Sequence, residues 1–215
     1  MSASTAIPLS PSDEPEAVVA GLVERARTAM EAFADADQAR VDEAVTALAW
    51  SLYKPGHAKS LAERAVEATG LGNVESKITK NTRKTFGTLR DLMRVKTVGI
   101  IEEDKAKGLV KWAKPVGVVA AISPSTNPSA TPVNKAMMAV KGRNAVIIAP
   151  SPAASGITGE TVDLSTRVTL FRVTWEAPER ILVELTLTGD DGESVAFSEY
   201  VHPRNTLQKV GKRVR

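Results

Sequence analysis

The sequence KPVGVVAAISPSTNPSATPVNKAMMAVKGRNAVIIAPSPAA, residues 114–154, decides the fold of this chain. Two short apolar runs, residues 116–122 and 145–149, flank a helical pattern over residues 131–140. Each run is continuous instead of alternating with polar residues, as is typical of parallel strands buried on both faces. The order strand, loop, helix, strand therefore predicts one βαβ unit with a right-handed crossover.

The residues before this unit are predicted to be helical. Apolar residues recur at helical spacing in four successive segments, residues 16–33, 37–53, 59–69 and 75–94. Lys54-Pro55-Gly56 ends the second segment and Gly70 closes the third, because Pro and Gly commonly end helices. Residues 97–102 and 108–115 then indicate a pair of strands around a polar turn.

After Ser155 the pattern changes to a period of two. Residues 168–175, 180–188 and 194–201 alternate apolar and polar side chains, which predicts antiparallel strands with one buried face. The expected fold class is α/β, with N-terminal helices, a truncated Rossmann-like parallel βαβ unit and a C-terminal antiparallel β ribbon. We divide the chain into a disordered lead-in (1–13), a helical section (14–95), a β ribbon with the βαβ unit (96–155) and an antiparallel tail (156–215).

Composition narrows the classes of function. The 28 basic and 25 acidic residues leave a net charge of only +3, which does not indicate a surface for nucleic acid. No apolar run reaches the roughly 20 residues that span a bilayer, so we expect no membrane partner and a cytoplasmic location. The chain has no cysteine, which excludes disulfides, zinc–thiolate sites and thiol nucleophiles. We predict no metal site.

Residues 114–154 resemble the first βαβ of the nucleotide-binding domain in the aldehyde dehydrogenase superfamily. The likeness is greatest to the CoA-acylating branch, whose members act on acetaldehyde-like or sulfoacetaldehyde-like substrates. It extends upstream through AVEATGLGNVESKITKN (residues 65–81) and RVKTVGIIEEDKAKGLVKWAKPVGV (residues 94–118). The resemblance covers about residues 14–154, corresponds to the N-terminal part of the family only, and leaves the tail of unknown origin.

The resemblance implies a site at the loops that follow the two parallel strands, where open α/β sheets bind ligands. Asn127 would donate a hydrogen bond that polarises the aldehyde carbonyl. The residues implied to contact NAD or NADP are Ser123, Pro124, Ser125, Thr126, Pro150 and Ser151. Alternatively, Asn127, which lies between Thr126 and Pro128, is a turn residue without a chemical role.

The family's reaction is the NAD(P)-dependent oxidation of an aldehyde to an acyl-CoA, in which a cysteine attacks the aldehyde and CoA takes the acyl group. This chain has no cysteine, so we predict a truncated protein that is inactive alone. An aldehyde and CoA are its implied small-molecule partners, and a homo-oligomer is expected from the family. Two alternatives stay open: a non-catalytic interaction module that pairs with another chain through its β tail, and one part of a split enzyme completed by another polypeptide.

Overall fold

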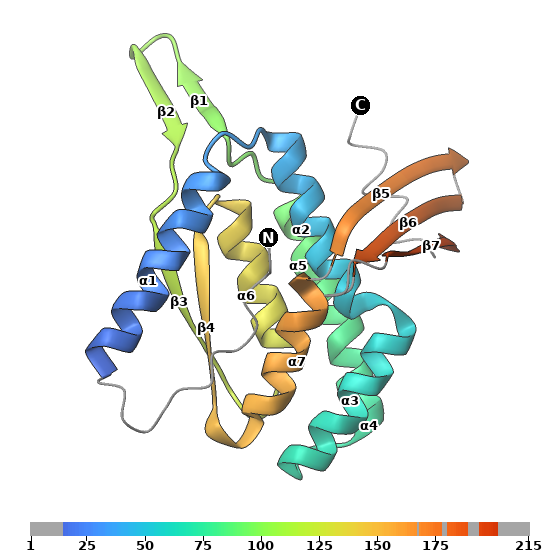
Figure 1. Cartoon of the computed structure of the whole chain (residues 1–215). Helices are drawn as coiled ribbons and strands as arrows, with labels where there is room; N and C mark the ends of the chain where they lie inside the picture. Colours follow the sequence, from blue (N-terminus) through green and yellow to red (C-terminus); the bar gives the residue numbers. More distant parts are fainter. Residues whose placement is uncertain (1–14, 167, 178–179, 189–193, 202–215) are drawn as a thin grey trace. The chain divides into compact units, whose positions relative to one another are not determined.

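A computed structural model describes residues 15–166, 168–177, 180–188 and 194–201 of the chain (Figure 1). The chain divides into two compact units, one within Ser4–Ser165 and one that begins at Thr166. The expected lead-in, residues 1–13, lies outside the described residues. Each unit is considered by itself below.

The first unit contains most of the helices and two small sheets. Its helical segments are α1 (Pro15–Ala32), α2 (Gln38–Tyr53), α3 (Pro55–Thr69), α4 (Val74–Thr79), the π-helix η1 (Lys80–Lys84), α5 (Thr85–Leu92), α6 (Ala130–Lys141), the 3₁₀-helix η2 (Pro152–Ala154) and α7 (Ser155–Thr166). Its strands are β1 (Gly99–Asp104), β2 (Leu109–Ala113), β3 (Val118–Ser123) and β4 (Ala145–Pro150). These elements confirm the expected α/β class.

Local sequence explains several helix boundaries. Asp37 caps α2 by accepting a hydrogen bond from the Arg40 amide at 2.8 Å, a common N-terminal arrangement. Pro55 occupies the first turn of α3, where its missing N–H is not needed, so α3 follows α2 without a loop. Gly70 ends α3 in the left-handed conformation (φ 64°), which suits glycine because it has no Cβ. The segment expected as one helix over residues 75–94 is interrupted by the π-helix η1.

The two parallel strands pair in register from Val118 opposite Ala145 to Ser123 opposite Pro150. Both α1 and α6 pack against this two-stranded sheet (Figure 1), and α6 is the crossover of the predicted βαβ unit. Strands β1 and β2 form a separate antiparallel ribbon. The expectation that the parallel strands are buried on both faces is wrong: Ile122 near the end of β3 is 73% exposed, because α1 covers β4 more than it covers β3.

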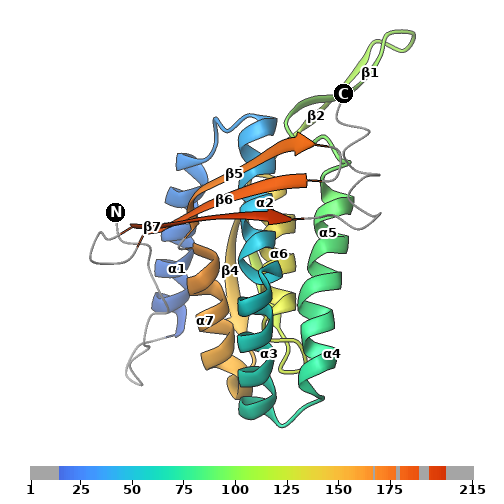
Figure 2. The ribbon, with the colours of Figure 1, turned by 90° about the vertical axis from the view of Figure 1, so that its right-hand side faces the viewer.

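The hydrophobic core of the first unit lies between helices. Figure 2 shows α2 and α3 as one column, beside an antiparallel column of α4, η1 and α5. The fully enclosed core side chains come from α2, α3 and α6, and they are Val41, Val45, Ala49, Leu52, Leu61, Ala130, Val133 and Met137. Burial of these apolar groups fixes α6, and α6 in turn fixes the loop that precedes it.

The second unit contains three antiparallel strands in the order β5 (Val168–Ala177), β6 (Arg180–Thr188) and β7 (Ser194–Val201). These strands agree closely with the three predicted segments. Residues 156–166, which we had included in the β tail, are instead part of the helix α7 and of the first unit. The helix forms there because Ile157, Thr158 and Thr161 are buried against the rest of that unit, and tertiary packing overrides a weak local helix propensity.

Candidate functional site

The carboxyl ends of β3 and β4 bring the two predicted site loops together. The backbone N–H of Ser151 donates to the carbonyl of Ser123 at 2.9 Å, so the second loop starts directly beside the first. We name residues 123–129 the site loop. Because it joins a parallel strand to the N-terminus of α6, it lies where open α/β sheets bind ligands.

The seven predicted site residues differ in exposure. Pro124, Thr126 and Pro150 are exposed, whereas Ser125, Asn127 and Ser151 are half-buried. Ser123 is only 1% exposed. Its hydroxyl has no hydrogen-bond partner within the described part of the chain. The structure therefore places Pro124, Thr126 and Pro150 at the surface and encloses the Ser123 hydroxyl.

Asn127 combines a fixed backbone with a free side chain. Its carbonyl accepts a hydrogen bond from the Thr131 amide at 3.3 Å, which links it to the first turn of α6. Among the described residues, no hydrogen bond involves its side-chain amide. A half-buried amide with an unused N–H₂ is a suitable donor to a carbonyl oxygen.

Three side chains from outside the site loop hold the loop and the strand before it. The Lys77 ammonium, from α4, donates to the Thr126 carbonyl at 3.0 Å. The Thr158 hydroxyl, from α7, donates to the Pro128 carbonyl at 3.2 Å, and the Lys135 ammonium donates to the Ile122 carbonyl. Sequence reasoning did not identify any of the three as part of the site.

The charge of Lys77 is held in an enclosed position. The residue is 5% exposed, and burial lowers the pKa of its ammonium below that of an exposed lysine. The nearby charge of Lys80 lowers that pKa further. A buried ammonium needs hydrogen-bond acceptors to offset its lost hydration, and the Thr126 carbonyl is such an acceptor.

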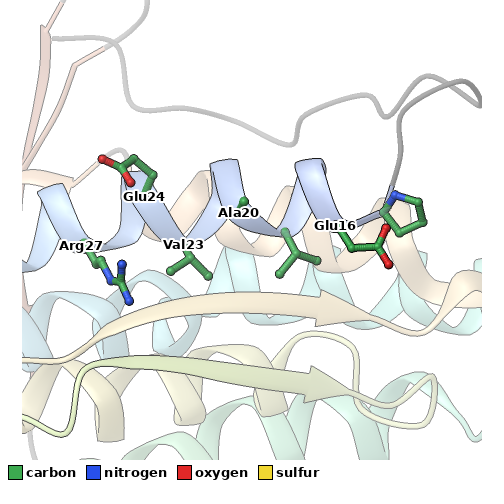
Figure 3. A pocket seen from close by; sticks show the side chains of 7 residues that line it. Glu16, Ala20, Val23, Glu24 and Arg27 are labelled. Carbon is green, nitrogen blue, oxygen red and sulfur yellow. The ribbon is translucent and has the colours of Figure 1, made fainter.

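Two hollows lie away from the site loop. One, of about 570 Å³, is lined entirely by residues of α1, and Figure 3 shows Val23 and Arg27 on the side of that helix that faces β4. The other, of about 320 Å³, lies between β3 and α6. Neither contains a cluster of polar groups suited to a reaction. Over the described residues, no three His, Asp or Glu side chains are grouped to hold a metal, and no helix is long and apolar enough to cross a membrane.

Comparisons with known proteins agree with this geometry. A family model described as the aldehyde dehydrogenase family matches residues 9–170. This range includes α7 and therefore extends beyond residue 154, where we expected the likeness to end. The sulfoacetaldehyde dehydrogenase (acylating) of Cupriavidus necator is 55% identical over 149 residues, which are 69% of this chain and 30% of that protein.

Solved structures show the same likeness. An acetylating aldehyde dehydrogenase from Geobacillus thermoglucosidasius superposes with a TM-score of 0.66 at 38% identity, over 69% of this chain and 32% of that one. A propionaldehyde dehydrogenase from Rhodopseudomonas palustris, solved with bound CoA and an acylated cysteine, gives a TM-score of 0.55 at 27% identity, over 68% of this chain and 33% of that one. The present chain thus spans about a third of the length of these proteins.

Proposed function

Because the chain belongs to the aldehyde dehydrogenase family, we propose that its first unit forms the front part of the cofactor and carbonyl site of a CoA-acylating enzyme. The relatives reported above carry the names acylating, acetylating and propionaldehyde dehydrogenase, which supports an aldehyde and CoA as the small molecules concerned. The observation that carries the proposal is the meeting of the two site loops at one sheet edge, beside the free amide of Asn127.

We assign Asn127 as the donor to the aldehyde carbonyl oxygen. Negative charge develops on that oxygen when a nucleophile attacks the carbonyl carbon, and a preorganised N–H donor stabilises it. The amide has no competing hydrogen bond within the described residues, and its backbone is fixed at the start of α6. It therefore does not need to break an internal contact before it binds the oxygen.

The cofactor is NAD or NADP, which accepts hydride from the aldehyde carbon when bound. Pro124, Thr126 and Pro150 present exposed surface for it, and Ser151 lies half-buried between the loops. Ser125 offers a small side chain that leaves room for a ring. Ser123 stays in the proposed set because of its place at the end of β3, although it is 1% exposed and its hydroxyl, which has no partner among the described residues, does not reach the surface.

The chain alone does not supply the nucleophile of this chemistry, since none of its residues is a cysteine. A serine is a weak nucleophile unless a base is in reach, and the site loop has no histidine. We therefore propose that residues 14–154 provide cofactor contacts and the Asn127 donor, and that acyl transfer requires a cysteine that these residues do not contain. A cytoplasmic location and a homo-oligomer remain predictions, the latter supported by the exposed Trp112 and Val110 on the ribbon.

Calorimetric titration of the full chain tests the cofactor site directly. We expect saturable binding of NAD⁺ or CoA with a dissociation constant in the millimolar range or tighter, about −4 kcal/mol. Thr126→Trp should abolish that heat, because it fills the surface between the loops. Thr28→Trp, on the exposed side of α1, is the matched control and should leave it unchanged. No saturable heat from either ligand contradicts the proposed site.

A further inference from the structure

Lys77 is an unusual buried lysine because its ammonium has no acidic partner among the residues that the structure describes. It is 5% exposed, and no ion pair links it to a carboxylate anywhere in the described residues. By contrast, the other deeply buried lysine, Lys141, is paired with Asp42. Lysine is seldom fully buried without a paired charge. The hydrogen bond of Lys77 goes instead to the Thr126 carbonyl of the site loop.

The helix that carries Lys77 is itself held firmly. Asn73 caps α4 by accepting a hydrogen bond from the Ser76 amide at 2.8 Å. One turn beyond Lys77, the buried Asn81 donates to the Ala58 carbonyl of α3 at 3.1 Å. The stem of Lys77 packs beside Gly72, where a Cβ would lie 3.9 Å from the Lys77 Cε. The Lys77 ammonium therefore extends from a helix that is capped at its start and held to α3 just beyond its end.

The bond to Thr126 has a direct consequence for Asn127. The Thr126 carbonyl and the Asn127 N–H and Cα belong to one planar peptide group, so fixing that carbonyl fixes the direction in which the chain enters Asn127. The next peptide plane is fixed as well, because the Asn127 carbonyl accepts from the Thr131 amide. Lys77 thus controls one of the two planes on either side of Asn127.

We infer that Lys77 is a positioning residue that orients Asn127 through the Thr126 carbonyl. The inference rests on the proposed role of Asn127 for its functional meaning, whereas its physical content is the order of the site loop. An ammonium donor is suited to this purpose because hydrogen bonds from charged groups are stronger than those between neutral groups. The contact joins α4 to a loop 49 residues later in the chain.

The test is the NMR order parameter of the Asn127 backbone and side-chain N–H groups in the full chain. In the wild type we expect values near the rigid limit of about 0.85 for the backbone. Lys77→Met keeps the length of the side chain and removes its donor. It should lower the Asn127 backbone value to about 0.6 or less and leave the core amide of Val45 unchanged.

Two further variants separate positioning from a general structural effect. Lys77→Arg retains charge and donors and should restore most of the Asn127 order. Lys80→Met removes the neighbouring charge, which makes no hydrogen bond with the site loop among the described residues, and should leave Asn127 as in the wild type. Unchanged Asn127 order in Lys77→Met overturns the inference, and so does an equal loss of order at Val45.

If Lys77→Met does not fold, the wild-type chain decides the matter by itself. The Lys77 ¹⁵Nζ signal should exchange slowly with water and show a coupling across the hydrogen bond to the Thr126 carbonyl carbon. Absence of both signatures overturns the inference. These results do not depend on cofactor binding, so a chain that binds neither NAD⁺ nor CoA contradicts the proposed function and leaves the positioning of Asn127 to be judged on its own readout.

Discussion

Asn127→Ala is expected to lower kcat by about 10²–10³-fold in a chimaera that supplies the catalytic cysteine. In this chimaera, residues 9–166 replace the matching front third of the Cupriavidus necator relative, which is 55% identical over the aligned residues. The relative supplies the remainder of its own chain, and acyl-CoA formation is measured with sulfoacetaldehyde, CoA and either NAD⁺ or NADP⁺. The effect is expected in kcat because the donor binds the oxygen most strongly in the transition state.

A change in kcat without a change in KM would identify the loss of a transition-state interaction as the cause. KM for the aldehyde should change little, since loss of an interaction made only in the transition state lowers kcat and kcat/KM equally. Asn127→Asp, which keeps the shape and removes the N–H₂ donor, should lose as much activity as Asn127→Ala. Thr28→Ala on α1 is the control and should retain full activity. A loss below tenfold for Asn127→Ala, or an inactive parent chimaera, contradicts the assignment.

Sequence reasoning located the elements of the first unit because their patterns are local. Helical spacing identified α2 through residues such as Val41, Val45 and Leu52, all of which are fully buried. The βαβ unit was predicted from two apolar runs on either side of a helix. Helix α7 was missed because Gly156 and Gly159 lower helix propensity. Its stability comes instead from tertiary contacts such as the bond from Thr158 to Pro128.

The exposure of Ile122 marks a second limit of sequence reasoning. A continuous run of small apolar residues, such as that of β3, predicts a strand that is buried on both faces. Whether another element provides that cover depends on which parts of the fold accompany it. In the described residues Ala121 is buried while Ile122 is 73% exposed, so the end of β3 is enclosed on one side only.

The candidate site likewise contains residues that the sequence predicted and supporting residues that it did not. Ser123, Asn127 and Ser151 were predicted from the family resemblance, which places them in the loops after the two parallel strands, and the hydrogen bond between Ser151 and Ser123 shows that these strand ends meet. Lys77 and Thr158 lie 49 and 30 residues from the loop carbonyls that they hold. Sequence spacing alone gives no sign of such contacts. Supports of this kind become visible only when the helices are placed in space.

The largest expected loss of stability comes from Asp42→Asn. Lys141 lies on α6, is 2% exposed, and its ammonium is paired with the Asp42 carboxylate on α2. Removal of the negative charge leaves a buried ammonium without its counter-charge, which costs about 3–5 kcal/mol. Asp42 also accepts a hydrogen bond from the Gln38 side-chain N–H₂ at 2.8 Å, and the side-chain oxygen Oε1 of Gln38 accepts from the Thr97 backbone amide at 2.8 Å. The substitution therefore disturbs a network that joins two helices to the segment before β1.

Substitution of the other partner, Lys141, is expected to cost much less stability. The quantity to measure is the difference between the two losses in free energy of unfolding. Lys141→Met replaces the buried cation with an apolar chain of similar length, while Asp42, whose side chain is 24% exposed, keeps access to water and to Gln38. We expect a loss of about 1 kcal/mol or less, because exchange of a buried charge for a well-packed apolar group is often close to neutral. The double variant should recover most of the stability lost in Asp42→Asn. Urea unfolding followed by circular dichroism gives the free energies, with unchanged m-values as the check on two-state behaviour. Equal losses in the two single variants would contradict the prediction, because they would show that an unpaired Lys141 ammonium costs no more than an unpaired Asp42 carboxylate.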